Sequence, residues 1–139
     1  MSFREKIAWA AFISTVLVWG SYFAALLLYN HDRHPPFTFF IAFVGCIVVQ
    51  AVLMTVVAIA GAVASPGDAR APIDERERGI ARRATAIAYY FLISAVLVLI
   101  AVMHMGIDLI QTIFALFAVV ALAEAIRYGA QAIGYRRGA

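Results

Sequence analysis

Charged residues and cysteines are scarce in this chain. Asp, Glu, Lys and Arg make up 14% of its 139 residues, and its single cysteine, Cys46, stands inside an apolar run. So few charged residues are not enough to form the surface of a water-soluble domain. At 65%, the hydrophobic residues are also far more than one small core can bury. A lone cysteine also excludes an internal disulfide framework. The composition therefore predicts an integral membrane protein.

Catalytic motifs are also missing from the sequence. No Ser, His and Asp come together at the depth of an apolar run, and there is no glycine-rich loop that would bind phosphate. Membrane enzymes that form disulfides need pairs of thiols, which this chain lacks. We therefore predict that the protein is not an enzyme and has no catalytic residues. Cys46 is expected to act as a small apolar side chain.

Long apolar runs dominate what is present. Four of them approach or exceed the roughly 20 residues that a membrane-spanning helix needs. Barrel strands are about 10 residues long and alternate in polarity, which these runs do not. We therefore predict an all-α fold, an integral membrane four-helix bundle that forms a single transmembrane domain over residues 1–139. The helices are expected at about residues 7–29, 37–64, 80–104 and 108–134, with a cytoplasmic loop at 65–79.

The basic residues predict the orientation of these helices. If the N-terminus is cytoplasmic, every Lys and Arg except Arg33 falls on the cytoplasmic side. Positive residues favour that side in membrane proteins, so both termini and the 65–79 loop are predicted to be cytoplasmic. The net charge of +3 is then a topology signal, and we expect no nucleic-acid binding. The surrounding lipid bilayer is the first predicted partner.

Two short external turns predict two antiparallel transmembrane hairpins. The first turn reads "NHDRHPP" and the second "HMGID", and so few residues leave consecutive helices side by side. Pro35 and Pro36 end one helix and start the next. Gly106 ends the third helix, and Asp108 is the predicted N-cap of the fourth.

The segment "DERERGIARR" before the third run carries a dense cluster of charge. Asp74 and Glu77, three residues apart, have the spacing of a capping box, and Glu75 is placed so that it can pair with Arg78. Exposed pairs contribute only about 0–1 kcal/mol each, so helix stability alone does not require so many charges. Two interpretations stay open: a cap with a cytoplasmic anchor, or a docking surface for a cytoplasmic protein partner or an anionic ligand. The candidate residues are Asp74, Glu75, Arg76, Glu77, Arg78, Arg82 and Arg83.

Three segments carry a family resemblance. "MSFREKIAW", "DERERGIARRA" and "EAIRYGAQAIGYRRG" resemble corresponding segments of small bacterial inner-membrane proteins with four predicted helices and a recurring Asp-Glu-Arg motif. The resemblance implies the four-helix fold and a bacterial inner (cytoplasmic) membrane location. It brings no activity and no catalytic residues, because that family is of unknown function.

Glu124 is a carboxylate close to the inner end of the fourth run. A charge at membrane depth is unfavourable without a partner, and Arg127 lies one turn further along the same helix. Arg82 or Arg83 of the neighbouring helix is the alternative partner. The pair is interpreted as structural, with a proton or substrate site as the sharper hypothesis.

The three histidines raise a metal hypothesis. His31, His34 and His104 all fall on the external side in the predicted topology, and two methionines flank His104. Imidazole with thioether suits Cu(I), and imidazole with carboxylate suits Zn. The spacing is weak evidence, so an external Cu or Zn site ranks third among the functions considered.

Helix association is the function that the sequence favours most. Gly20 with Ala24, Ser21 with Ala25, and the run "AIAGAVAS" place small residues four apart, which lets helices approach closely. We predict a homodimer that acts through its charged cytoplasmic face as a regulator or partner-binding subunit. A small dimeric transporter or channel is the alternative, although Gln50, its candidate pore residue, more often bonds a neighbouring helix.

Overall fold

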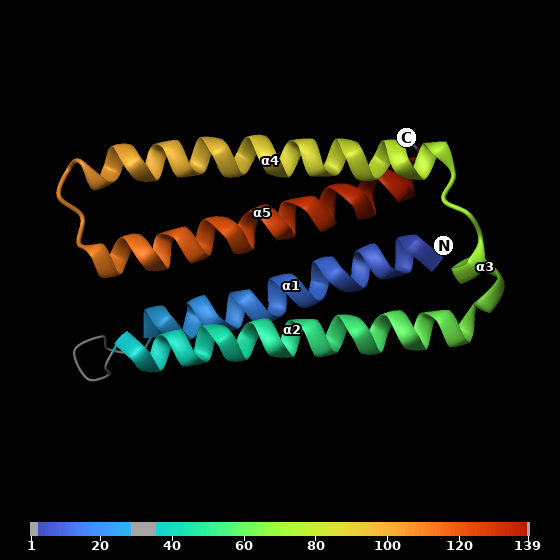
Figure 1. Cartoon of the computed structure of the whole chain (residues 1–139), viewed down its shortest axis with the longest axis horizontal. Coiled ribbons are helices and arrows are strands. Elements are labelled where there is room, and N and C mark those ends of the chain that lie inside the picture. The colour runs from blue at the N-terminus through green and yellow to red at the C-terminus, as the bar shows by residue number, and fades with distance from the viewer. Residues whose placement is uncertain (1–2, 29–35, 139) are drawn as a thin grey trace. The chain divides into compact units, whose positions relative to one another are not determined.

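The structure, a computed structural model, describes residues 3–28 and 36–138, and every regular element in those ranges is a helix (Figure 1). Four of the helices are long and apolar enough to cross a membrane, which confirms the predicted all-α class and indicates a multi-pass membrane protein. The helices are α1 (Phe3–Leu28), α2 (Pro36–Ala64), α3 (Pro66–Arg70), α4 (Glu75–Met103) and α5 (Leu109–Arg137).

Three of the long helices extend further into their charged flanks than the apolar runs indicated. Helix α1 begins at Phe3 rather than near residue 7, α4 begins at Glu75 rather than near 80, and α5 ends at Arg137 rather than near 134. The five-residue helix α3 also occupies part of the segment expected as a loop at 65–79. An apolar run marks only the part of a helix that avoids water, because backbone hydrogen bonding continues where the side chains are charged.

The chain divides into two compact units, unit 1 (Met1–Ile73) and unit 2 (Asp74–Ala139), and the single transmembrane domain stays a prediction. In unit 1, helix α1 packs against α2. The Phe3 ring lies where a side chain on Gly61 would project. Toward the other end of α1, the Tyr22 hydroxyl donates a hydrogen bond to the Phe39 carbonyl oxygen at 3.3 Å. The start of α1 therefore meets the end of α2, and the end of α1 meets the start of α2.

Unit 2 is built from α4 and α5, which pack along each other. The Ile80 side chain lies against Gly134, so that a Cβ on this glycine would come within 2.6 Å of the Ile80 Cγ2 atom. Small residues are buried on both helices, including Ala84, Ala121 and Ala132. Side chains of this size let two helix backbones approach closely, which is how helices pack where lipid surrounds them.

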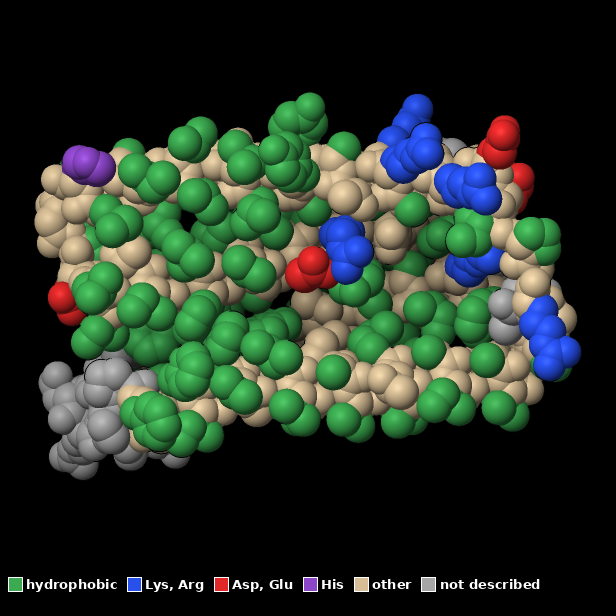
Figure 2. All heavy atoms as spheres, in the orientation of Figure 1, with side chains coloured by type: hydrophobic (Ala, Val, Ile, Leu, Met, Phe, Trp, Pro, Cys, Tyr) green, Lys and Arg blue, Asp and Glu red, His purple; other side chains and the backbone are tan. Residues whose placement is uncertain are grey.

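The helices expose large hydrophobic side chains along most of their length (Figure 2). Helix α2 is the extreme case, because no residue in its most apolar stretch is buried. A water-soluble monomer rarely exposes an apolar surface of this extent. Hydrocarbon chains of a bilayer are the natural solvent for it, which agrees with the four candidate spans.

The Ile80–Gly134 contact allows a test of the packing in unit 2. Changing Gly134→Ala adds a methyl group that the β-branched Ile80 has to accommodate, and such overpacking costs about 1–3 kcal/mol. This loss exceeds the gain of about 1 kcal/mol from better helix propensity. We expect a net loss of stability when unfolding is followed by circular dichroism in mixed detergent and dodecyl sulfate micelles.

The matched control is Gly79→Ala on the exposed side of α4, where an added Cβ meets no atom within 4 Å. That variant should gain up to about 1 kcal/mol from helix propensity alone. A Gly134→Ala protein as stable as the Gly79→Ala protein would show that α4 and α5 do not pack at this position.

Candidate functional site

The first turn of α4 contains the predicted capping box. The Asp74 Oδ1 atom accepts a hydrogen bond from the Glu75 amide at 2.7 Å, and the Glu77 Oε2 atom accepts one from the Asp74 amide at 3.3 Å. The Asp74 side chain also accepts a hydrogen bond from the Glu77 backbone amide, which completes the box, so Asp74 is the N-cap residue and Glu77 occupies position N3. The two acids also lie at the positive end of the helix dipole. The capping prediction is confirmed.

The other charges of this segment are not engaged by the cap. The side chains of Glu75, Arg76, Arg78, Arg82 and Arg83 are exposed. The ion pair for which Glu75 and Arg78 are placed is not formed, and neither residue bonds another side chain that the structure describes. Holding two long, solvated side chains together gains little in water, which accounts for this difference. The charges remain available to a partner.

The end of α5 lies beside the start of α4 in unit 2. The Arg76 guanidinium is within 3.0 Å of the position that a Cβ on Gly138 would take. Arg136 and Arg137, which are exposed in the last turn of α5, therefore belong to the same end of the unit as the arginines of α4. Figure 2 shows a cluster of Lys and Arg side chains at the end where α4 begins. These residues are far apart in the chain, and the fold of unit 2 gathers them at one end.

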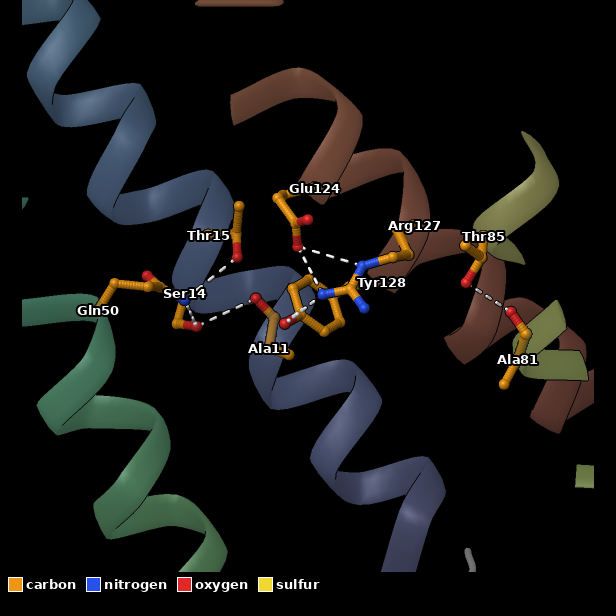
Figure 3. A network of polar contacts seen from close by, with 9 residues as sticks. All are labelled: Ala11, Ser14, Thr15, Gln50, Ala81, Thr85, Glu124, Arg127 and Tyr128. Atoms are coloured by element: carbon orange, nitrogen blue, oxygen red, sulfur yellow. Dashed lines mark hydrogen bonds and ion pairs between the residues drawn. The ribbon is translucent and has the colours of Figure 1, made fainter. Parts of the chain in front are cut away.

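Glu124 forms an ion pair within its own helix (Figure 3). The Arg127 Nη2 atom donates to the Glu124 Oε2 atom at 2.6 Å, and its Nε atom donates to the same oxygen at 3.2 Å. The Arg127 guanidinium also donates to the Tyr128 hydroxyl oxygen at 2.8 Å and lies 4.4 Å from the centre of that ring. Three consecutive polar contacts therefore hold one arginine in place.

Glu124 pairs with Arg127, its partner on the same helix. Among the residues that the structure describes, neither Arg82 nor Arg83 makes an ion pair with this carboxylate. The pair is half-buried, with 46% of the Glu124 side chain and 32% of the Arg127 side chain exposed. At 1.5 Å per residue, Glu124 lies about 22 Å along the axis from the first residue of α5. This geometry fits a structural pair, and the proton or substrate site stays a prediction.

A polar cluster in the middle of unit 1 joins α1 to α2 (Figure 3). The Gln50 Nε2 atom donates to the hydroxyl oxygens of Ser14 at 3.0 Å and of Thr15 at 3.2 Å. Both hydroxyl residues are buried, and the Gln50 Oε1 atom is buried without a hydrogen bond to any described atom. The expectation that Gln50 bonds a neighbouring helix is confirmed. The signal for this cluster was a lone glutamine at the centre of an apolar run.

The described residues do not form a metal site around the predicted histidines. His31 and His34 lie outside the described residues, and the His104 Nδ1 atom is 2.8 Å from the Ile100 carbonyl oxygen at the end of α4. Within residues 3–28 and 36–138, no three His, Cys, Asp or Glu side chains are close enough to hold a metal ion. An external Cu or Zn site therefore remains a prediction.

The chain matches no protein-family model, no curated protein and no solved structure. The resemblance to the inner-membrane family with the Asp-Glu-Arg motif therefore stays a prediction.

The pairing of Glu124 with Arg127 allows a test by a double-mutant cycle. We expect Arg127→Gln alone to destabilise the protein by about 1–3 kcal/mol, because it leaves a carboxylate unpartnered inside a long apolar helix. The double variant Glu124→Gln, Arg127→Gln should lose less than Arg127→Gln alone, since no charge is then left unpaired. Unfolding in mixed micelles measures the stability of the two single variants, Glu124→Gln and Arg127→Gln, and of the double variant.

Arg137→Gln in the exposed last turn of α5 is the control and should stay within about 0.5 kcal/mol of the parent. If the stability lost in the double variant equals the sum of the losses in the two single variants, the two side chains do not stabilise each other, and the ion pair makes no contribution to the stability of α5.

Proposed function

We propose that this chain is a non-catalytic integral membrane protein of the bacterial inner membrane, which binds a cytoplasmic protein through the charged start of α4. The observation that supports the proposal most is that the start of α4 carries more charged side chains than its helix cap uses. The capping box engages Asp74 and Glu77, whereas Glu75, Arg76 and Arg78 are exposed. Exposed charges of both signs in a fixed helical order are a typical basis for partner specificity.

The proposed placement in the membrane has four spans with both termini in the cytoplasm. The contacts of unit 1 run in opposite directions along α1 and α2, and those of unit 2 do so along α4 and α5. These contacts support two antiparallel transmembrane hairpins, and the distribution of Lys and Arg supports their orientation. The charged start of α4 then projects into the cytoplasm.

Self-association is proposed as the assembly state. Gly20, Ser21, Ala24 and Ala25 are exposed on α1, and a Cβ on Gly20 would meet no atom within 4 Å. Gly61 differs, because Phe3 and Ile7 already occupy the space beside it. The open small-residue face of α1 therefore supports a homodimer.

The orientation can be tested by cysteine labelling in a Cys46→Ser background. Met105 between α4 and α5 is 84% exposed, and Met105→Cys should react with a membrane-impermeant thiol reagent in intact cells. Ile73 precedes α4 and is also exposed, and Ile73→Cys should react only after the cells are lysed. Labelling of Ile73→Cys in intact cells together with protection of Met105→Cys would reverse the proposed orientation.

A charge exchange tests the proposed binding face. The double variant Glu75→Arg, Arg78→Glu keeps Asp74, Glu77 and the net charge, so the helix cap and the membrane orientation should persist. An anionic group on the partner would then meet a carboxylate where it met a guanidinium, and binding should be lost. Affinity purification of the exchanged and parent proteins, followed by mass spectrometry, compares the bound proteins.

Asp74→Ala is the complementary variant, because it removes the N-cap and leaves Glu75 and Arg78 in place. It should lower stability by about 0.5–2 kcal/mol and keep the partner. An unchanged set of bound proteins after the charge exchange, with normal insertion, would reduce the segment to a helix cap and membrane anchor.

A further inference from the structure

We propose that α4 carries a binding site for the headgroup of an anionic phospholipid, formed by Arg82 and Arg83 together with Tyr89 and Tyr90. The site rests on the membrane placement proposed above and is independent of the protein-binding face at the start of the helix. It lies one turn or more further along α4, at the level where the charged flank gives way to the apolar span.

The four side chains form two parallel rows on the open side of α4. Residues seven apart in a helix lie nearly above one another, so Tyr89 follows Arg82 and Tyr90 follows Arg83 at about 10 Å along the axis. Both arginines are exposed, as are 57% of Tyr89 and 70% of Tyr90. The two tyrosine rings contact each other edge to face, with centroids 5.8 Å apart. This contact joins the two rows into one surface.

None of these polar groups has a partner in the part of the chain that the structure describes. The guanidinium groups of Arg82 and Arg83 make no hydrogen bond or ion pair there, and the hydroxyls of Tyr89 and Tyr90 make none either. Two tyrosine hydroxyls within a membrane-spanning helix require acceptors, because hydrocarbon offers none. The arginines are donors without a counter-ion at the headgroup level.

The direction of the side chains fits a single lipid molecule. Side chains of a helix tilt toward its N-terminus, and the N-terminus of α4 is cytoplasmic in the proposed placement. The tyrosine hydroxyls therefore lie on the cytoplasmic side of their rings, and the arginines, which tilt in the same direction, stay about 10 Å further along the axis. A phosphate held by the guanidinium groups would place its glycerol esters within the zone of the tyrosine hydroxyls.

The charge of the site selects the class of lipid. Arginine binds phosphate through two parallel N–H bonds, and two neighbouring arginines favour a headgroup whose negative charge is not balanced by an amine. The acids Asp74, Glu75 and Glu77 lie five or more residues further toward the N-terminus, so they do not neutralise the pair locally. A soluble anion would use the arginines alone, whereas the exposed tyrosines favour a ligand with acyl chains.

Native mass spectrometry of the purified full chain in dodecyl maltoside tests the site, with phosphatidylglycerol and phosphatidylcholine of the same chain length as probes. The parent protein should retain phosphatidylglycerol preferentially. Arg82→Gln, Arg83→Gln should weaken phosphatidylglycerol binding about tenfold or more. Tyr89→Phe, Tyr90→Phe, which keeps both rings, should weaken it about fivefold.

Two further variants separate a defined site from diffuse attraction. Arg136→Gln, Arg137→Gln removes the same charge from the end of α5 and should leave most of the preference intact. Arg82→Lys, Arg83→Lys keeps the charge and the inside bias but loses the paired N–H geometry, and it should still weaken binding about fivefold. This second variant decides the question if the glutamine variant fails to fold. Equal retention of both lipids by the parent, full binding by the lysine variant, or an equal loss in the α5 variant would each overturn the proposal.

Discussion

A polar group inside a bilayer has no water to bond, and the arrangement of this chain follows from that constraint. The backbone satisfies it by forming four long helices, whose N–H and C=O groups bond within each helix. Most charged side chains satisfy it by standing at the helix ends. Among the polar side chains deep in the helices, Gln50 bonds Ser14 and Thr15 of the neighbouring helix, and Thr55 bonds the Ala51 carbonyl oxygen of its own helix.

The same constraint acts differently on the charges inside α5 and on those at the start of α4. Glu124 and Arg127 lie within a long apolar helix, and they are paired at 2.6 Å. The arginines at the start of α4 lie where water is available, and they are exposed without a described partner. An ion pair is required inside the apolar helix but optional at the exposed start of α4. The unpaired charges at the start of α4 are therefore the ones that can bind a partner. The two proposed partners, a cytoplasmic protein and an anionic lipid, would then bind at different levels of α4.

Close packing without a water-driven hydrophobic effect depends on shape, and the two units achieve it with small residues. Phe3 fills the space beside Gly61 in unit 1, and Ile80 fills the space beside Gly134 in unit 2. In each case a large side chain of one helix meets a glycine of the other, so contact is made where lipid tails would otherwise compete equally well. The sequence shows the glycines, but it does not show which large side chain each of them receives.

The sequence by itself determined the all-helical fold class, the four long helices and the N-cap residues of α4 and α5, Asp74 and Asp108. These features depend on local quantities: the length of an apolar run, and the spacing of an acid from the amide that it accepts from, as in Asp74 and Glu77. It also offered Arg127 as the local candidate for Glu124, because residues three apart share a helix face, with Arg82 or Arg83 as the alternative, and the structure selected Arg127. Only the tertiary structure decided that Gln50 bonds Ser14 and Thr15, that Arg76 lies beside the end of α5, and that Glu75 and Arg78 stay apart. Such contacts join residues far apart in the chain or depend on competition with water, and neither is encoded in the local pattern of a helix.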